Sequence, residues 1–346
     1  MKLRDLLGVE RPVIQAPMAG SQGSALSIAV SNAGGLGSLP CALLSLAALR
    51  SELSAIASGT KGPVNLNFFC HTPAAPSPER EAAFRASLAP YYQELGLSLS
   101  DVLAAPERKP FDESMVELIE EFAPRVVSFH FGLPTDALLQ RVKRCGAKVL
   151  SSATTLAEAR WLEARGVDAV IAQGAEAGGH RGMFLSDDVT TQVGTFALVS
   201  QLARNLSVPV IAAGGISSER DVRAAQALGA AAVQVGTAFL FSPEATPSPI
   251  HRAALQSEAA GTTAITNLFT GRPARGIVNR LIREQGPLCA LAPAFPRAAE
   301  AVSPLRAEAE RKGSADFSPL WCGQNALGCQ TMPAAERTRA LAAGFA

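Results

Sequence analysis

The stretch Val170–Gly182 holds the residues with the clearest potential for chemistry. A short apolar run ends at Gln173 and leads into a loop that carries one histidine, His180, and several glycines (Gly174, Gly178, Gly179 and Gly182). Because glycine has no Cβ, the backbone of such a loop can approach a flat or phosphorylated ligand closely. An imidazole titrates near neutral pH and can move protons. We therefore predict that His180 is catalytic, with Glu176 as a nearby acid.

Two later segments also end in glycine. Gly214 and Gly215 follow the apolar run Val208–Ala213, and Gly236 precedes Thr237 at the end of the next apolar run. In β/α barrels the loops after the last two strands commonly bind a phosphate through backbone N–H groups. Either pair alone could serve only a tight turn, but the two together favour a phosphate site.

Four amide side chains stand at the ends of apolar runs. They are Gln15, Asn67, Gln173 and Gln234. Amides offer both donors and acceptors, which suits the edge of a flavin or a similar heterocycle. The alternative is that they satisfy one another inside the protein.

The other histidines have weaker signals. His130 lies between two phenylalanines in an apolar run and could reach the barrel interior. His71 follows an apolar run and could line a substrate pocket or face water. His251 falls in an outer helical segment and is expected to be solvent-exposed. Arg272 and Arg275 could clamp an anion, but we favour hydrogen bonds from them to carbonyl groups that tie the C-terminal part to the rest.

The pattern of apolar runs and amphipathic segments predicts the fold. The eight predicted strands are Val13–Ala16, Leu36–Leu39, Val64–Phe69, Val126–Phe131, Lys148–Ser151, Ala169–Gln173, Val208–Gly215 and Ala232–Thr237. Near-continuous apolar strands alternating with helices indicate a buried parallel sheet, and eight strands close a TIM-type (β/α)8 barrel. An open dinucleotide-binding sheet would need G-x-G-x-x-G after its first strand, where Pro17-Met18-Ala19-Gly20 stands instead.

Two segments exceed what a simple barrel needs. Residues 70–124, after the third strand, contain a Pro-rich loop and helices predicted at 79–95 and 113–122, which indicates an insertion packed on the barrel rim. We predict a barrel over residues 1–269, including this insertion, and a helical C-terminal extension over residues 270–346 packed on the barrel.

Composition limits the class of protein. Hydrophobic residues make up 48% and charged residues 18% of the 346 residues, with a net charge of +1. This balance leaves no basic surface for nucleic acid, and no apolar run is long enough to cross a bilayer. The first ten residues lack a secretory signal, so we expect a cytoplasmic location. The six cysteines lack C-x-x-C spacing, and we expect no metal site.

These motifs together resemble the nitronate monooxygenases, formerly called 2-nitropropane dioxygenases. The similarity runs from about Val13 to Arg280 and is most specific in the loop Glu-Ala-Gly-Gly-His-x-Gly. The segments that carry it are Gln15–Met18, Asn65–Phe68, Ser128–Gly132, Gln173–Gly182, Ala213–Ile216, Gln234–Thr237 and Gly271–Gly276. Val235 stands where many members have methionine.

The resemblance implies a barrel that binds FMN and oxidises alkyl nitronates, including propionate 3-nitronate, with O₂ to a carbonyl compound and nitrite. By this resemblance His180 matches the active-site histidine. The residues implied to contact FMN are Met18, Asn67, Gln173, Gly178, Gly179, Gly214, Gly215, Gln234, Gly236 and Thr237.

Two other functions remain open from the sequence. One is an FMN-dependent NAD(P)H oxidoreductase of the enoyl-acyl-carrier-protein reductase or quinone reductase type, because such barrels share the Ala-Gly-Gly-His loop. The other is a flavin- or phosphate-binding barrel without catalysis. For the nitronate monooxygenase, the implied partners are a small nitronate and O₂.

Overall fold

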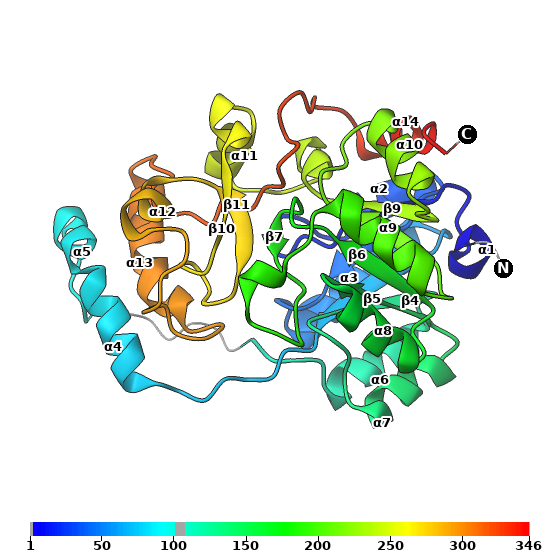
Figure 1. Cartoon of the computed structure of the whole chain (residues 1–346), viewed down its shortest axis with the longest axis horizontal. Coiled ribbons are helices and arrows are strands. Elements are labelled where there is room, and N and C mark those ends of the chain that lie inside the picture. The colour runs from blue at the N-terminus through cyan, green and yellow to red at the C-terminus, as the bar shows by residue number, and fades with distance from the viewer. Residues whose placement is uncertain (1–2, 101–107, 346) are drawn as a thin grey trace.

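The computed structural model describes residues 3–100 and 108–345, and a ring of eight parallel strands forms its centre (Figure 1). The strands are β1 Val13–Gln15, β2 Gly37–Pro40, β3 Val64–Phe69, β4 Val126–His130, β5 Lys148–Ala153, β6 Ala169–Gln173, β8 Val210–Ala213 and β9 Ala232–Val235. The sheet order is β1-β9-β8-β6-β5-β4-β3-β2. Leu36, the residue before β2, makes two backbone hydrogen bonds with β1, of 3.0 and 2.9 Å. These bonds join the two edges of the sheet, β1 and β2, and close the ring. The predicted eight-stranded barrel is therefore confirmed.

Helices surround this ring. They are α2 Ser24–Asn32, α3 Leu46–Gly59, α6 Glu113–Phe122, α7 Asp136–Arg144, α8 Leu156–Ala164, α9 Thr195–Asn205, α10 Glu219–Ala227 and α14 Ala334–Ala342. The strand β9 is followed by a short 3₁₀ helix, η2 (Thr237–Phe241), and not by a barrel helix. The C-terminal α14 packs against α2 and α10 and occupies the eighth helical position. The predicted domain boundary after residue 269 remains a prediction. Residues beyond this boundary, in α14, complete the ring of helices.

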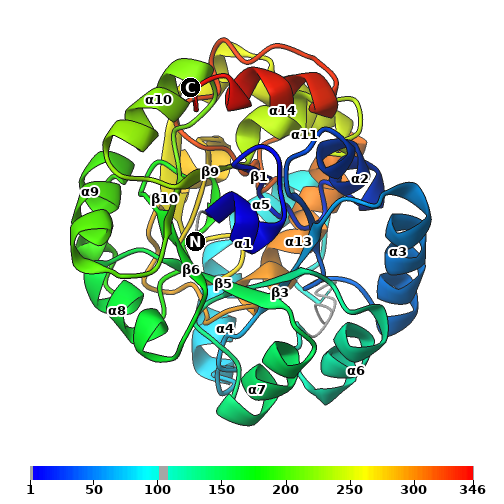
Figure 2. The ribbon, with the colours of Figure 1, turned by 90° about the vertical axis from the view of Figure 1, so that its right-hand side faces the viewer.

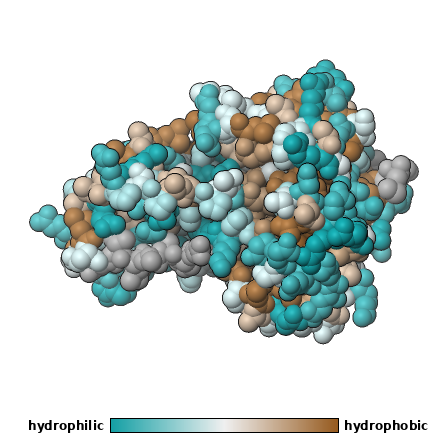
Figure 3. Space-filling model, turned by 90° about the horizontal axis from the view of Figure 1, so that it is seen from below, coloured by the Kyte–Doolittle hydropathy of each residue, from teal (hydrophilic) through white to brown (hydrophobic). Residues whose placement is uncertain are grey.

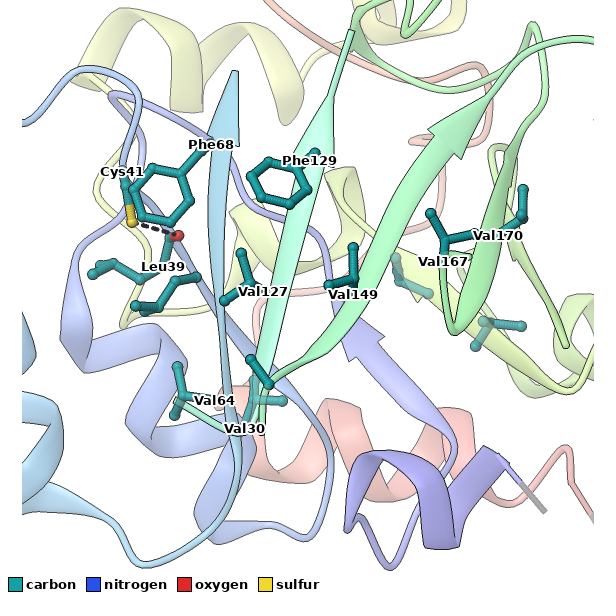
Figure 4. Packing of buried hydrophobic residues seen from close by; sticks show 14 of the residues in the cluster. Val30, Leu39, Cys41, Val64, Phe68, Val127, Phe129, Val149, Val167 and Val170 are labelled. Carbon is teal, nitrogen blue, oxygen red and sulfur yellow. Dashed lines mark hydrogen bonds between the residues drawn. The ribbon is translucent and has the colours of Figure 1, made fainter. Parts of the chain in front are cut away.

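Alternation along each strand divides the core in two. Val127, Val149 and Val170, drawn in Figure 4, belong to a buried cluster that includes residues of the surrounding helices, so they point outward from the ring. Their neighbours point into the barrel, where Leu150 and other apolar side chains pack together. The helix α1 (Leu3–Leu7) covers the amino-terminal end of the ring with its buried leucines (Figure 2). The opposite end, where the strands finish, is left for ligands.

A small helical lobe stands beside the barrel on the left of Figure 1. It contains α4 (Pro78–Ser87), α5 (Ala89–Leu95), α12 (Arg280–Gln285) and α13 (Ala298–Arg311), which share a separate apolar core. The helix predicted over 79–95 is two helices, because Pro90 lacks the N–H that would continue the first one. Both pack mainly against α13, whereas α6 packs as a barrel helix against α3 and α7. Residues 101–107 of the predicted insertion lie outside the described residues.

A three-stranded antiparallel sheet connects the lobe to the barrel. Its strands are β7 (Gly179–His180), β11 (Ala274–Ile277) and β10 (Thr263–Thr266), with β11 in the middle. The connections between the elements include α11 (Pro249–Leu255) and the 3₁₀ turns η1 (Val189–Thr191) and η3 (Glu258–Gly261). The sequence did not predict β7, a strand of two residues whose partner lies about a hundred residues away.

The face in Figure 3 is mostly hydrophilic, with hydrophobic residues in small separate groups. In the described part of the chain, no helix combines the length and the apolar character needed to span a membrane.

Candidate active site

A cavity of about 400 Å³ opens at the carboxyl ends of the barrel strands, between the barrel and the helical lobe. His180 and His130 line it. So do the ten residues predicted to contact a cofactor: Met18, Asn67, Gln173, Gly178, Gly179, Gly214, Gly215, Gln234, Gly236 and Thr237. His71 does not line it, because its ring is buried and its Nε2 lies 3.0 Å from the carbonyl oxygen of Arg108.

His180 is held on β7, opposite Ala274 of β11. Its Nε2 lies 2.9 Å from the hydroxyl of Thr270, and no hydrogen bond to its Nδ1 is found among the described residues. Rings of Phe295 and Trp321 lie 5.5 Å from the imidazole, measured between centroids. One ring nitrogen is thus anchored, and the other is free for a substrate.

The surroundings of His180 favour its neutral form. Burial lowers its pKa well below the ordinary value, and the positive charges of Arg108 and Arg272 lower it further. At neutral pH the imidazole therefore has a lone pair and can accept a proton. The same cations would favour an anion bound beside it.

His130 forms a hydrogen bond with the backbone of His180. Its Nε2 lies 3.2 Å from the carbonyl oxygen of His180, and its Nδ1 lies 2.6 Å from the hydroxyl of Ser152. A carbonyl can only accept, so Nε2 donates and Nδ1 accepts from Ser152. Burial lowers the pKa of His130 to about 3, which keeps this neutral tautomer. Both ring nitrogens bond to protein groups, so His130, which lines the cavity, holds the backbone of His180 in position.

Replacing His130 with phenylalanine is expected to remove both hydrogen bonds while keeping a ring of similar size. Two buried hydrogen bonds correspond to about 1–3 kcal/mol of unfolding free energy, which denaturant titration would measure. Ser152→Ala removes only one of the two bonds and should cost less. Equal stability of His130→Phe and the unaltered protein would contradict this role.

Gln173 and Arg181 fix the loop that carries His180. The amide of Gln173 donates from Nε2 to the carbonyl oxygen of His180 at 3.0 Å and accepts from the N–H of Gly182 at 2.7 Å. The fully buried Arg181 donates to the carbonyl oxygens of Gln173 and Gly174 at 2.6 and 2.8 Å. The loop is therefore held by protein contacts on both sides of His180.

Glu176 does not act as the acid predicted near His180. Its carboxylate accepts hydrogen bonds from the backbone N–H and the hydroxyl of Thr195, at 2.8 and 2.7 Å. Thr195 is the first residue of α9, where a carboxylate satisfies N–H groups that lack a helical partner. Glu176 is close to His180 along the chain, but its carboxylate bonds to the start of α9.

The ends of β8 and β9 form a cradle of backbone donors. In the described chain, no hydrogen bond is found from the N–H groups of Gly214, Gly215, Gly236 and Thr237, all of which line the cavity. Gly214 and Gly215 have φ angles of +118° and +71°, which favour glycine. Unpartnered N–H groups converging from two loops suit a phosphate. The N-terminus of α10 does not add to them, because Ser218 and Asp221 cap it.

The predicted amides differ in what they offer a ligand. Gln234 has a buried Oε1 without a partner, so a donor from a ligand would satisfy it. Asn67 uses its amide nitrogen on the hydroxyl of Ser128 at 2.8 Å. Gln15 does not line the cavity, because its side chain bonds to Gln22 and to the N–H of Ser38. The amides thus divide between ligand-facing and structural roles.

The structure brings several residues to the cavity that sequence reasoning missed. They include Arg108, Phe269, Thr270, Arg306, Trp321 and Asn325. His251 also lines it and was expected to be exposed. Instead it is buried on α11 with its Nε2 3.0 Å from the carbonyl oxygen of Trp321. These residues come from the lobe and the C-terminal part, which meet the barrel only in the folded chain.

Arg272 and Arg275 bond to carbonyl groups, as favoured from sequence. Arg275 donates to the carbonyl oxygen of Ala175 at 2.7 Å, and Arg272 donates to that of Met183. The guanidinium of Arg272 also lies 4.0 Å from the ring centroid of Phe131. These bonds join the β10–β11 region to the loop after β6.

Comparison with known proteins decides the family. The family model described as "Nitronate monooxygenase" matches residues 1–341. The nitronate monooxygenase of Pseudomonas aeruginosa is 41% identical over 341 residues, covering 97% of this chain and 96% of that protein. The chain belongs to the nitronate monooxygenase family.

Solved structures agree with this assignment. A nitroalkane oxidase from Streptomyces ansochromogenes superposes with a TM-score of 0.89 at 36% identity, over 99% of this chain and 97% of that one. FabK from Thermotoga maritima superposes with a TM-score of 0.73 at 27% identity, over 99% and 95%. As a nitronate monooxygenase family member, the chain is a flavin-dependent oxidoreductase that acts on a small molecule.

Proposed function

We propose that this protein is an FMN-dependent nitronate monooxygenase that oxidises alkyl nitronates with O₂ to a carbonyl compound and nitrite. The observation that carries the proposal is the position of His180. Its free Nδ1 lies in an aromatic cavity flanked by cations, and the cavity continues to the backbone donors after β8 and β9.

The residues present fit FMN. The unpartnered N–H groups of Gly214, Gly215, Gly236 and Thr237 would hold its phosphate. The buried Oε1 of Gln234 would accept from the N–H edge of its ring system. A Cβ at Gly179 would meet no atom within 4 Å, so the loop leaves open space beside its backbone. When bound, FMN supplies the electron transfer to and from substrate and O₂.

His180 would have a different task with each form of the substrate, the neutral nitroalkane and the anionic nitronate. Neutral His180 can remove the α-proton of a nitroalkane through Nδ1, since Nε2 is engaged with Thr270. A nitronate is already deprotonated and needs no base. An anion beside the ring would raise the pKa of His180, and a protonated His180 would hold the nitronate oxygens electrostatically.

Arg108 supports propionate 3-nitronate, which carries a carboxylate as well as the nitronate. Its guanidinium lines the cavity and lies 5.2 Å from the ring centroid of Phe295. Burial alone lowers its pKa, and no ion pair to it is found within residues 3–100 and 108–345. A desolvated guanidinium without a counter-charge suits a substrate carboxylate.

The decisive experiment compares electron donors without oxygen. The purified protein with bound flavin is mixed anaerobically with ethyl nitronate or propionate 3-nitronate, and in a separate sample with NADPH. We expect the nitronates to bleach the flavin absorbance and NADPH to leave it unchanged over the same time.

Other outcomes identify the alternatives. Rapid bleaching by NADPH alone would favour an NAD(P)H-dependent oxidoreductase over the proposed function. Bound FMN that none of these donors reduces would favour a flavin-binding barrel without catalysis. Release of nitrite after oxygen is admitted would identify the product.

A further inference from the structure

Residues Trp321–Asn325 of the C-terminal extension pack against the loops that form the phosphate cradle, which consists of the backbone N–H groups of Gly214, Gly215, Gly236 and Thr237. The N–H of Gly323 donates to the hydroxyl oxygen of Thr237 at 2.9 Å. The N–H of Gln324 donates to the carbonyl oxygen of Glu176 at 3.0 Å. The amide nitrogen of Asn325 donates to the carbonyl oxygen of Gly215 at 2.8 Å. One short segment therefore touches the loops that follow β6, β8 and β9.

The fit between this segment and the barrel is close. A Cβ at Gly178 would lie 2.6 Å from the backbone nitrogen of Gly323, and a Cβ at Gly323 would lie 2.9 Å from the carbonyl oxygen of Glu176. Both positions need glycine for the two backbones to meet. Glycine in the Ala-Gly-Gly-His loop thus serves the docking of the C-terminal extension as well as the cavity.

The contacts also orient the donors of the cradle. The hydroxyl oxygen of Thr237 accepts from Gly323, and this bond holds the Thr237 side chain in place. Asn325 ties down the Gly214–Gly215 turn and lies 3.3 Å from the carboxylate of Asp221, which caps α10. Gly323 and Asn325 line the same cavity as the cradle.

We propose that the segment Trp321–Asn325 is part of the phosphate subsite, and that Asn325 slows the release of FMN by holding the Gly214–Gly215 turn. This inference rests on the proposed function, which supplies FMN as the ligand. It assigns to the C-terminal extension a role in holding the cofactor. Asn325 acts through the turn and is a positioning residue.

The test compares FMN with riboflavin, which has the same ring system without the phosphate. Apoprotein of the full chain and of Asn325→Ala is titrated with each flavin by fluorescence quenching, and release is followed after dilution. Loss of one hydrogen bond that positions the cradle is expected to raise the FMN dissociation constant about fivefold, mainly through faster release. The riboflavin constant should stay within about twofold of the unaltered protein, because the ring half of the site is untouched.

Two further variants sharpen the result. Gln330→Ala is the matched control, because this amide lies outside the segment Trp321–Asn325, is exposed, and makes no side-chain hydrogen bond that is found in the described residues. It should bind both flavins normally. Asn325→Asp keeps the shape but adds a negative charge beside the cradle and Asp221, so it should weaken FMN more than Asn325→Ala does, again without affecting riboflavin.

The outcomes separate the two proposals. Selective weakening of FMN supports the role of the segment. Unchanged FMN binding in both Asn325 variants, or equal weakening of FMN and riboflavin, overturns it while the proposed function stands. If the unaltered apoprotein binds neither flavin, the proposed function falls and this inference falls with it. Circular dichroism of each variant shows whether it is folded.

Discussion

Replacing His180 with asparagine is expected to lower kcat/KM for a neutral nitroalkane by about 10²–10⁴-fold, the usual contribution of a general base. The substitution removes the imidazole that lines the cavity beside Phe295 and Trp321 and that bonds through Nε2 to Thr270. Steady-state oxygen consumption with nitroethane and with ethyl nitronate measures the effect. The nitronate needs no base, so its rate should fall less than that of the nitroalkane.

The pH dependence follows from the direction of the pKa shift. Burial and nearby cations lower the pKa of His180, so its basic form is present at neutral pH and is lost only as pH falls through that lowered value. Turnover of nitroalkane should therefore stay level from neutral to mildly acidic pH and then decline. A decline centred near the ordinary histidine pKa would contradict the burial of this group.

A buried histidine elsewhere in the cavity provides the control. His251→Asn also removes an imidazole, one whose Nε2 lies 3.0 Å from the carbonyl oxygen of Trp321. It should lower stability without the selective loss on nitroalkane. If both variants lose the same activity on both substrates, general disturbance of the cavity explains the His180 result better than base catalysis.

The sequence predicted those parts of the site that a local sequence pattern indicates. His180 and the glycines after β6, β8 and β9 stand directly after apolar runs, and the barrel places all such strand ends on one side. The pairing of β7 with β11 was not predictable, because two residues of strand carry no periodic signal. The same reason applies to Trp321, which lacks any local sign that its ring faces His180.

Burial was harder to predict than position along the chain. His251 lies in a short helix outside the barrel, so the sequence indicated an exposed side chain, but it is buried and bonds to Trp321 of the C-terminal extension. The position of α14 in the ring of helices was also not predictable from the sequence. An isolated amphipathic helix of nine residues does not show which gap it fills, and α14 fills the gap between α10 and α2.

Replacing Arg108 with glutamine is expected to separate substrates by charge. For propionate 3-nitronate, loss of a charge-assisted hydrogen bond of about 1.5–3 kcal/mol corresponds to a fall in kcat/KM of roughly 10–100-fold, mainly through KM. Propyl-1-nitronate has the same chain length without the carboxylate and should change by less than about threefold.

Lys109 offers the matched control for this experiment, because it is the next residue, is exposed and carries the same charge. Lys109→Gln should leave both substrates unaffected, which isolates the contact made inside the cavity from a general change in surface charge. Equal losses for the two nitronates in Arg108→Gln would mean that the guanidinium acts on the nitronate group or on the pKa of His180. Unchanged kinetics would show that the carboxylate is bound elsewhere, and Arg306, which also lines the cavity, would then be the next cation to replace.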